Sequence, residues 1–334
     1  MRLSALAASI PAMMALALIG CSGSSLSSSA TASASTPSAQ PLTPSQLKDS
    51  AVKCLRSRDL ACAESSFSDY IKLRPTDSKA IANLGMVLNH EDKDEAAIVQ
   101  FEKAIAMGEG AYDLFGMYAD SLAKVGRVDD AIDWSYKTLK LVPSLVDVRG
   151  KLAKLLLIKN RRYEALALLA EFDQYLNAHG QRPYFEAERI AMESVGHVDE
   201  PAVPGESDKL RLVKLDSEFF APVVVGESGT HAFVVDTGAS SVVLNDDFLA
   251  ASKAKYAITR THVTARVADG KIVSAKEVLI DRLNVGSFEL DDVHALVCST
   301  CSLLLGENAL TKFDMSSTQI QGVDVLTLTR RKHS

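Results

Sequence analysis

The sequence predicts a multidomain α + β protein, in which an all-α region of helical repeats is followed by an all-β domain. Two observations carry this prediction. From residue 44 onward, small and large residues recur with a period of 34 residues, as in stacked helical hairpins, and from Leu210 onward apolar and polar residues alternate, as in strands. The chain has 334 residues, enough for two ordinary domains, and its 47% hydrophobic content is sufficient to bury a core.

Residues 1–20 have the pattern of a targeting segment rather than of a folded element. Arg2 supplies a positive charge, and the apolar run over residues 3–19 is short for a transmembrane helix. The run ends in Leu-Ile-Gly-Cys, with the cysteine at position 21, and this ending resembles the lipobox of bacterial lipoproteins. The resemblance implies a signal peptide over residues 1–20, cleavage before Cys21 and lipidation of that cysteine. The alternatives are an uncleaved anchor and an ordinary secreted protein with a chance cysteine.

The residues after Cys21 extend this prediction to the location of the protein. A lipobox cysteine followed by aspartate is usually retained at the inner membrane, whereas Ser22 favours the outer membrane. We therefore expect a lipid-anchored protein of the bacterial cell envelope that faces the periplasm. Residues 21–43 are rich in Ser, Ala, Thr and Pro with almost no charge, which predicts a flexible tether.

The charge distribution argues against nucleic-acid binding. The net charge is −6, and no cluster of Lys and Arg alternates with aromatic residues. The seven histidines are scattered without the order of a catalytic triad or the spacing of a metal site, and the chain has no glycine-rich phosphate loop. We therefore expect no cofactor and no metal.

Alanines at a constant spacing define the helical repeats. Ala63, Ala97, Ala131 and Ala165 lie 34 residues apart, and a proline follows twelve residues after the first and the third of them. This pattern resembles the tetratricopeptide repeat (TPR), in which small residues lie where the two helices of a hairpin touch. The resemblance implies a TPR solenoid over residues 44–194 with a concave face. That face is either a groove for a peptide or a protein client, or part of a scaffold or dimerisation module.

The cysteines predict two disulfide bonds. The chain has five cysteines, so four remain if a lipid modifies Cys21. Cys54 and Cys62 fall on the two helices of the first hairpin, close enough for a disulfide. Cys298 and Cys301 lie between strands, which favours a small structural disulfide over a redox site or half of a zinc site. Export into an oxidising compartment favours both bonds.

The chain changes character before the β-domain. Residues 195–207 hold two Pro and two Gly, which predicts a linker between the domains. In residues 208–334 short apolar runs with a period of two are separated by Gly, Asp and Asn. The predicted strands are residues 210–215, 220–226, 231–236, 241–245, 262–268, 272–286, 293–298 and 325–330.

One loop in the β-domain has the residues of a catalytic site. Asp236-Thr237-Gly238 follows an apolar strand, Ala239 and Ser240 come directly after it, and a second apolar strand follows. The apolar flanks would desolvate the carboxylate, and the glycine permits a close approach of the backbone. The loop resembles that of the pepsin-like aspartic peptidases, in which a serine at the position of Ala239 donates a hydrogen bond that favours the ionised carboxylate. Alanine has no such donor, so the resemblance implies activity nearer to neutral pH than to pH 3.

Two later segments extend this pattern: the predicted hairpin tip Asp269-Gly270 and the apolar run Leu304-Leu305-Gly306. In order and spacing the three segments resemble the retropepsin-like aspartic peptidases. The resemblance implies a closed acid-protease barrel over residues 208–334, with Asp236 as the catalytic residue, residues 237–240 as the support of its loop, and the hairpin tip as a flap. The Asp-Gly pair also fits an ordinary type I′ turn.

Peptide hydrolysis at such a site needs two carboxylates, because one activates the water and the other protonates the leaving nitrogen. The chain holds one Asp-Thr-Gly and no Asp-Ser-Gly. We therefore predict a homodimer in which Asp236 meets the partner's Asp236. Residues 325–329, as an interleaved terminal strand, and the solenoid are the two candidates for the dimer interface.

The leading prediction is an aspartic endopeptidase that hydrolyses a peptide or protein substrate, with the repeats selecting a protein client. The alternative is a catalytically inactive lipoprotein that binds peptides through the TPR surface and a degenerate barrel. Residues 245–247, Lys271 and Glu307 depart from the resemblance and keep this alternative open. A purely structural tether between membrane and cell wall would not need the Asp236 loop.

Overall fold

The computed structural model describes residues 42–194, 209–266 and 272–331. The predicted signal peptide, Cys21, most of the tether, the linker over residues 195–207 and the flap tip at Asp269 and Gly270 lie outside the described residues. Within them, no helix has both the length and the apolar content that crossing a membrane requires.

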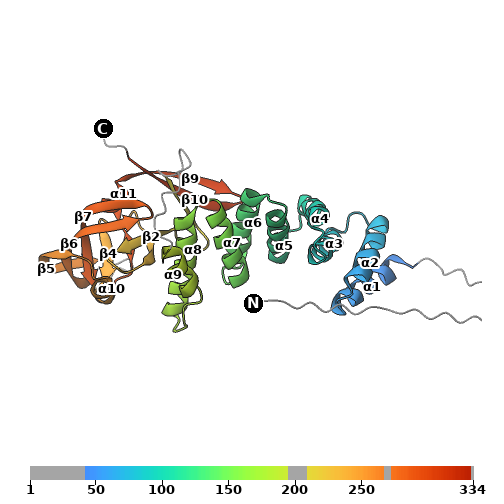
Figure 1. The fold of residues 1–334 in the computed structure, drawn as a ribbon, viewed down its shortest axis with the longest axis horizontal. Helices are drawn as coiled ribbons and strands as arrows, with labels where there is room; N and C mark the ends of the chain where they lie inside the picture. The colour runs from blue at the N-terminus through green and yellow to red at the C-terminus, as the bar shows by residue number, and fades with distance from the viewer. Residues whose placement is uncertain (1–41, 195–208, 267–271, 332–334) are drawn as a thin grey trace, which may run out of the picture. The chain divides into compact units, whose positions relative to one another are not determined.

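The first part of the described chain is a series of helices joined by short turns (Figure 1). The helices pack in pairs, and Ala63, Ala97, Ala131 and Ala165 are all buried in the second helix of a pair. These pairs confirm the predicted helical repeats. The elements are α1 (Pro44–Arg56), α2 (Leu60–Leu73), α3 (Ser78–His90), α4 (Asp94–Ala106), α5 (Tyr112–Lys124), α6 (Val128–Leu141), α7 (Val146–Ile158), α8 (Arg162–Ala178) and α9 (Glu186–Ser194).

Close packing between helices explains why small residues recur in the repeats. At Gly85 in α3, an added Cβ would lie 2.7 Å from the ring of Phe101 in α4, which is fully buried. Carbon atoms do not approach that closely in a packed core, so a glycine fits there and a larger residue does not. Ser135 takes the place of the aromatic residue in the third repeat, and its hydroxyl group donates to the Ala131 carbonyl oxygen at 2.7 Å.

The second part of the chain is rich in strands (Figure 1). Two short helices interrupt the strands. The elements are β1 (Lys209–Val213), β2 (Phe220–Val225), β3 (Thr230–Val235), β4 (Val242–Asn245), α10 (Asp246–Ser252), β5 (Tyr256–Arg266), β6 (Ile272–Val285), β7 (Phe288–Cys298), β8 (Leu304–Leu305), α11 (Glu307–Leu310), β9 (Phe313–Ile320) and β10 (Val323–Arg330).

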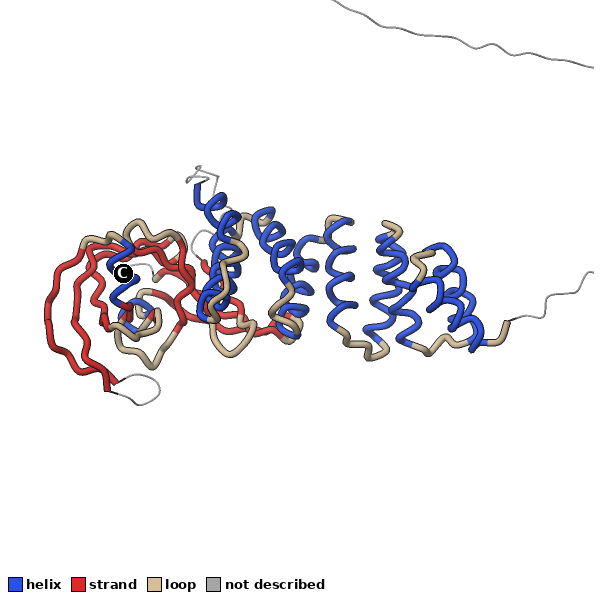
Figure 2. The backbone as a smooth tube through the Cα atoms, turned by 90° about the horizontal axis from the view of Figure 1, so that it is seen from below, coloured by secondary structure: helices blue, strands red, loops and turns tan. Residues whose placement is uncertain are grey.

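The strands form two sheets. One is antiparallel with the order β1-β10-β9, and the other has the order β2-β3-β8-β4-β7-β6-β5. Because β2 pairs with both β3 and β6, the larger sheet closes on itself, and Figure 2 shows strands curving around a common interior. Phe233, Leu244 and Ile280 are fully buried in that interior. This arrangement confirms the predicted all-β barrel.

Strand β9 is absent from the sequence prediction. Residues 314–319 are exposed, so they lack the alternation of buried and exposed residues that marks a strand. The strand forms because Gln321 and Gly322, with φ of 50° and 76°, make a two-residue turn that returns the chain onto β10. Residues 325–329, one of the two candidates for the dimer interface, pair with β1 and β9 on opposite edges, so this part of β10 has no free edge in the chain.

The helical and strand-rich parts share a hydrophobic core. Leu215 and Val323 of the β-domain pack in the same cluster as Tyr136 of α6. Near them, the Lys140 ammonium group donates to the Gly322 carbonyl oxygen at 2.7 Å. Residues 42–334 accordingly form one compact unit.

Candidate active site

The Asp236 loop starts at the end of β3, where neighbouring strands hold its backbone on both sides. The Val235 amide donates to the Phe219 carbonyl oxygen at 2.9 Å, and the Asp236 amide donates to the Leu305 carbonyl oxygen at 3.1 Å. These hydrogen bonds tie the backbone of Val235 and Asp236 to the segments on both sides. The position of Asp236 is therefore set by the sheet rather than by the loop that follows.

The carboxylate of Asp236 is half-buried and bends back onto its own loop. Its Oδ1 accepts a hydrogen bond from the Gly238 amide at 2.8 Å, and an added Cβ at Gly238 would lie 3.1 Å from the same oxygen. Thr237 and Gly238 are exposed. In the described part of the chain, the second carboxylate oxygen has no hydrogen-bond partner. The loop therefore presents one oriented carboxyl group next to an accessible backbone turn.

The predicted apolar-glycine segment, residues 304–306, lies directly against the Asp236 loop. Strand β8 pairs with β3 on one side and β4 on the other, so it lies between the strands that flank the loop. An added Cβ at Gly306 would overlap the Ser241 carbonyl group and lie 2.8 Å from the Ala239 carbonyl oxygen. A glycine is required there because two backbone segments approach more closely than a side chain allows.

Asn308 fastens the loop to the rest of the barrel. Its Oδ1 accepts a hydrogen bond from the Val242 amide at 2.9 Å, its Nδ2 donates to the His294 carbonyl oxygen at 2.7 Å, and its backbone amide donates to the Ser240 carbonyl oxygen at 3.2 Å. The sequence alone predicts no role for this residue. The available signal was a side-chain amide two residues after Gly306, inside an apolar run.

Two of the segments that depart from the family resemblance lie at the N-termini of short helices. Asn245 ends β4 and caps α10, with its Oδ1 accepting from the Phe248 amide at 2.7 Å, and residues 246–247 place negative charge in the first helical turn. Glu307 begins α11, and its amide donates to the Ala239 carbonyl oxygen at 2.7 Å. Asn245 therefore has a structural role as a helix cap, whereas the hydrogen bond at Glu307 involves its backbone and not its side chain.

The hairpin that carries the predicted flap is formed by β5 and β6. The strands pair from Tyr256 opposite Ile280 to Arg266 opposite Ile272. The tip with Asp269 and Gly270 lies outside the described residues, so its role as a flap stays a prediction.

Cys298 and Cys301 are joined by a disulfide at the end of β7, and both are buried. The bond packs against Val243 of β4 and Ala275 of β6. It therefore links the segment before β8 to the strands around the Asp236 loop, as a structural bridge would.

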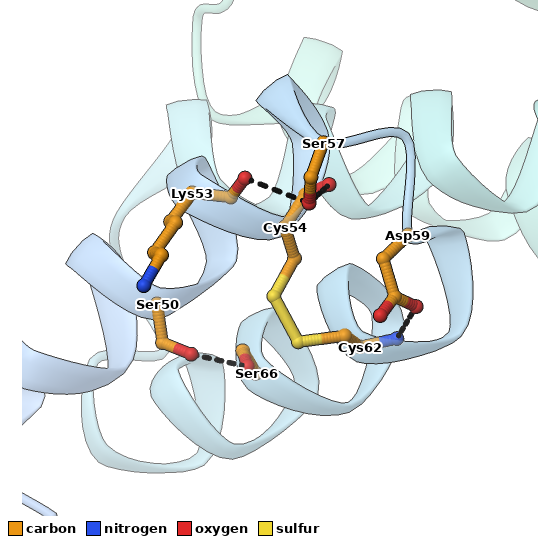
Figure 3. The surroundings of a disulfide bond; sticks show 7 residues. All are labelled: Ser50, Lys53, Cys54, Ser57, Asp59, Cys62 and Ser66. Carbon is orange, nitrogen blue, oxygen red and sulfur yellow. Dashed lines mark hydrogen bonds between the residues drawn. A yellow bond between two sulfur atoms is a disulfide. The ribbon is translucent and has the colours of Figure 1, made fainter.

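Cys54 of α1 and Cys62 of α2 are also joined by a disulfide (Figure 3), with their Cα atoms 5.7 Å apart. A hydrogen bond of 3.2 Å between the hydroxyl groups of Ser50 and Ser66 lies beside it. Asp59 caps α2 by accepting from the Cys62 amide at 3.1 Å. The first hairpin is thus held together by a covalent bond where only one neighbouring repeat supports it.

Replacing both cysteines, in a Cys54→Ser/Cys62→Ser protein, is expected to destabilise the first hairpin by about 2–3 kcal/mol, the loop-closure value for so short a loop. Hydrogen exchange in α1 and α2 should then quicken while exchange in the β-domain stays the same, because a terminal repeat can unfold by itself. Unchanged exchange in α1 would show that the bond contributes nothing to the stability of this hairpin.

The histidine on β3, the strand that leads to Asp236, is His231. The His231 ring is half-buried on β3, with its Nε2 3.0 Å from the Ser228 carbonyl oxygen. The Phe248 ring lies nearly perpendicular to it, with the two ring centroids 4.8 Å apart. Burial lowers the pKa of His231 below its ordinary value, which keeps it neutral at pH 7. Among the described residues, no three His, Cys, Asp or Glu side chains are placed to hold a metal ion.

Comparison with known proteins covers both parts of the chain. Residues 222–312, which include the Asp236 loop, β8 and α11, match the family described as "gag-polyprotein putative aspartyl protease". No curated protein matches the chain at a significant level.

Solved structures of TPR proteins match the helical region. The first TPR of Spaghetti bound to an HSP90 peptide is 14% identical, covers 35% of this chain and 93% of its own, and has a TM-score of 0.33. YrrB, a TPR protein with an unusual peptide-binding site, is 20% identical, with 41% and 71% covered and a TM-score of 0.38. MamA from Desulfovibrio magneticus is 18% identical, with 39% and 73% covered and a TM-score of 0.37. The β-rich domain is therefore similar to retropepsin-like aspartyl proteases over residues 222–312, and TPR-like helical repeats precede it.

Proposed function

We propose that this protein is a membrane-anchored aspartic endopeptidase of the bacterial cell envelope, which acts as a homodimer and recruits its protein client through the helical repeats. The observation that carries the proposal is the Asp236 loop. One carboxylate is oriented by the Gly238 amide on a backbone held by two strands, with Thr237 exposed beside it. A loop of this construction is suited to meet a second copy of itself.

The chemistry follows from bringing two Asp236 carboxyl groups together. Two carboxylates in contact cannot both ionise, so they share one proton. The ionised group takes a proton from a water molecule, which attacks the peptide carbonyl carbon, and the protonated group donates its proton to the leaving nitrogen. The hydroxyl group of Thr237 has no hydrogen-bond partner among the described residues and is therefore available to the second loop.

The outer edge of β9 is the surface that we propose for pairing with the second copy. Within the described strands, β9 ends its sheet and offers one unpaired edge, and its residues 314–319 are exposed. An exposed strand edge presents unpaired backbone N–H and C=O groups, which are able to pair with a strand of another chain. Residues 325–329 have no such free edge, because β1 and β9 occupy both sides of β10.

A Ser317→Pro substitution in β9 is expected to weaken dimerisation by about tenfold or more, because proline removes a backbone N–H and its ring obstructs strand pairing. Ser317→Ala keeps the N–H and should dimerise like the wild type. Sedimentation of both proteins across a range of concentrations measures the effect. If the proline variant dimerises normally and keeps its unfolding temperature, the interface lies elsewhere.

A groove in the helical repeats is the proposed site for the client. A cavity of about 860 Å³ is lined by α3, α5, α6 and α7, with the apolar residues Met117, Val148 and Leu155 and the charged residues Asp113 and Lys154. Its mixture of apolar and charged groups suits an extended peptide segment. This groove also favours the second candidate function, in which the protein binds peptides without cleaving them.

The lipid anchor at Cys21 belongs to the same proposal. The lipobox-like ending of the apolar segment supports it. Acyl chains buried in a bilayer would hold the protein at the outer membrane, facing the periplasm. Confinement to a surface raises the local concentration of the chains and favours pairing of two copies.

The first experiment uses soluble protein comprising residues 42–334 on a mixed peptide library between about pH 4 and 8. We expect cleavage whose rate per chain rises with protein concentration, because the active site forms in the dimer. Peptides that bind the repeats but are never cut, at concentrations where the protein is a dimer, would favour the non-catalytic function.

A further inference from the structure

The strand that leads to Asp236 has an edge that the barrel only partly completes. Along this edge the backbone groups of alternate residues point outward from β3. The Val234 amide donates to the Leu303 carbonyl oxygen at 3.0 Å, and the Asp236 amide donates to the carbonyl oxygen of Leu305 in β8 at 3.1 Å. Strand β8 pairs with β3 only at Val234 and Val235. The outward groups of Thr230 and Ala232 therefore need other partners.

A side chain of the last repeat takes the place of the missing strand at Ala232. The Gln174 Oε1 accepts from the Ala232 amide at 2.5 Å, and its Nε2 donates to the Ala232 carbonyl oxygen at 3.0 Å. A side-chain amide has one acceptor and a donor side by side, as a peptide group of a paired strand does. Figure 1 shows α8, which carries Gln174, beside the strands of the β-domain, and α8 packs against β2 and β3.

Helix α9 binds the same edge two residues earlier. The Thr230 amide donates to Glu193 Oε1 at 2.7 Å, and the Arg189 guanidinium group donates to the Thr230 carbonyl oxygen at 3.1 Å. An added Cβ at Gly229 would lie 3.0 Å from Glu193 Oε2, so the approach is close. Arg189 is itself oriented by Asp173, a buried carboxylate on α8, at 2.9 Å.

From these contacts we infer that Gln174, Arg189 and Glu193 are positioning residues for Asp236, so that the helical repeats complete the ladder of the strand that carries the catalytic carboxylate. The inference rests on the proposed peptidase function. Ala232 and Asp236 are four residues apart on one strand, about 13 Å at the ordinary rise of a strand. A displacement of β3 at Ala232 is therefore transmitted to Asp236 through a short, hydrogen-bonded backbone.

The edge of β3 is buried at Thr230 and Ala232, which are 3% and 1% exposed. Water therefore does not satisfy their outward backbone groups, and the protein has to supply the partners. Here three side chains from two helices are bound instead, and Arg189 is held by a carboxylate that is 1% exposed. This carboxylate also accepts from the amides of Tyr184 and Phe185 at 2.8 and 2.9 Å, which fixes the corner between α8 and α9. The side chain of Arg189, which binds the edge of β3, is thus held by the hydrogen-bonded corner between α8 and α9.

The test uses two substitutions of Gln174 in the full-length protein. Gln174→Leu keeps a side chain of similar size and removes both hydrogen bonds to Ala232. We expect kcat for peptide cleavage to fall about tenfold or more, because small displacements of a catalytic group have large effects on rate. KM should change little, because the substrate contacts remain. The unfolding temperature should fall, because the buried Ala232 amide and carbonyl group lose their partners, so kcat is compared at temperatures where both proteins are folded.

Gln174→Glu adds a pH signature that a purely structural role would not produce. An ionised carboxylate accepts from the Ala232 amide but repels the Ala232 carbonyl oxygen, whereas a protonated carboxyl group donates to that oxygen as glutamine does. The kcat of this variant, relative to the wild type, should therefore recover as the pH falls below the pKa of the new carboxyl group, which burial beside the Ala232 carbonyl oxygen raises above the ordinary value of about 4.3. Gln100→Glu is the matched control, because among the described residues the Gln100 side chain in α4 has no hydrogen bond.

Hydrogen exchange of the amides over residues 230–239 provides a measurement that does not need catalysis. Faster exchange at Asp236 and Ala239 in Gln174→Leu supports the inference, and a change confined to Ala232 with unchanged kcat overturns it. A wild-type protein that cleaves no peptide as a dimer overturns the proposed function instead. The exchange data would still decide whether the repeats hold the Asp236 loop.

Discussion

An Asp236→Asn protein is expected to lose peptide cleavage by at least about 1,000-fold, because asparagine can neither take a proton from water nor donate one as a carboxylic acid. The substitution keeps the shape of the side chain and the Oδ1 that accepts from the Gly238 amide at 2.8 Å. The unfolding temperature should therefore stay near that of the wild type. Initial rates on peptides that the wild type cleaves, measured where the protein is a dimer, give the result.

Mixing the wild type with Asp236→Asn tests whether the site is shared between two chains. In an equal mixture at constant total concentration, about one quarter of randomly formed dimers contain two Asp236 carboxyl groups. The cleavage rate should fall to about one quarter of the all-wild-type rate. A rate near one half would mean that each chain holds a complete site, and the shared dyad would be wrong.

Asp247→Asn is the matched control for the loss of a carboxylate. Asp247 is exposed in the first turn of α10, and it follows the Asp236 loop closely along the chain. We expect full activity from it. Equal cleavage by the Asp236→Asn and Asp247→Asn proteins would identify a different catalytic group or a contaminating peptidase.

A Gly306→Ala substitution is expected to lower the free energy of unfolding by about 3 kcal/mol or more, and to abolish cleavage with it. The new methyl group would overlap the Ser241 carbonyl group and lie 2.8 Å from the Ala239 carbonyl oxygen. Both neighbours are backbone, and both are part of the Asp236 loop or its exit. Relief therefore requires the loop to move away from β8. Denaturant unfolding of the purified protein measures the loss.

Two glycines elsewhere serve as controls for Gly306→Ala. At Gly116 in α5, an added Cβ would make ordinary contacts of 3.6 and 3.8 Å, so Gly116→Ala should be neutral or stabilising by about 0.5–1 kcal/mol. At Gly322 there is open space but φ is +76°, so Gly322→Ala should cost about 1 kcal/mol through backbone strain. If Gly306→Ala is no worse than Gly322→Ala, the packing of β8 against the loop is looser than described.

Most of the fold was open to prediction because its signals are local. The alanines from Ala63 to Ala165 repeat at a fixed distance and are all buried where two helices touch. Strand β9 could not be predicted from the sequence, because residues 314–319 are exposed and have no alternating pattern. Its pairing depends on a turn at Gln321 and Gly322, and the neighbouring strand β10 supplies all of its ladder.

In the candidate site, too, some residues could be predicted from the sequence and others could not. Asp236 and the segment over residues 304–306 are identified by residue type and order along the chain. Asn308 binds the Val242 amide across 66 residues, and Gln174 binds Ala232 across 58. Nothing within either local segment marks these residues as partners, since many polar side chains occur at similar positions on helices. The contacts exist because the core brings those segments together.

The helical repeats, most of the strands and the loop that bears the carboxylate could be predicted, because periodicity and residue type are local signals. That β9 is a strand, that β8 lies between β3 and β4, that Gly306 has no room for a side chain and that the repeats bind the edge of β3 are visible in the folded structure alone. These features follow from the packing of distant segments. That packing is selected by burial of the whole core, which outweighs the preference of any single segment.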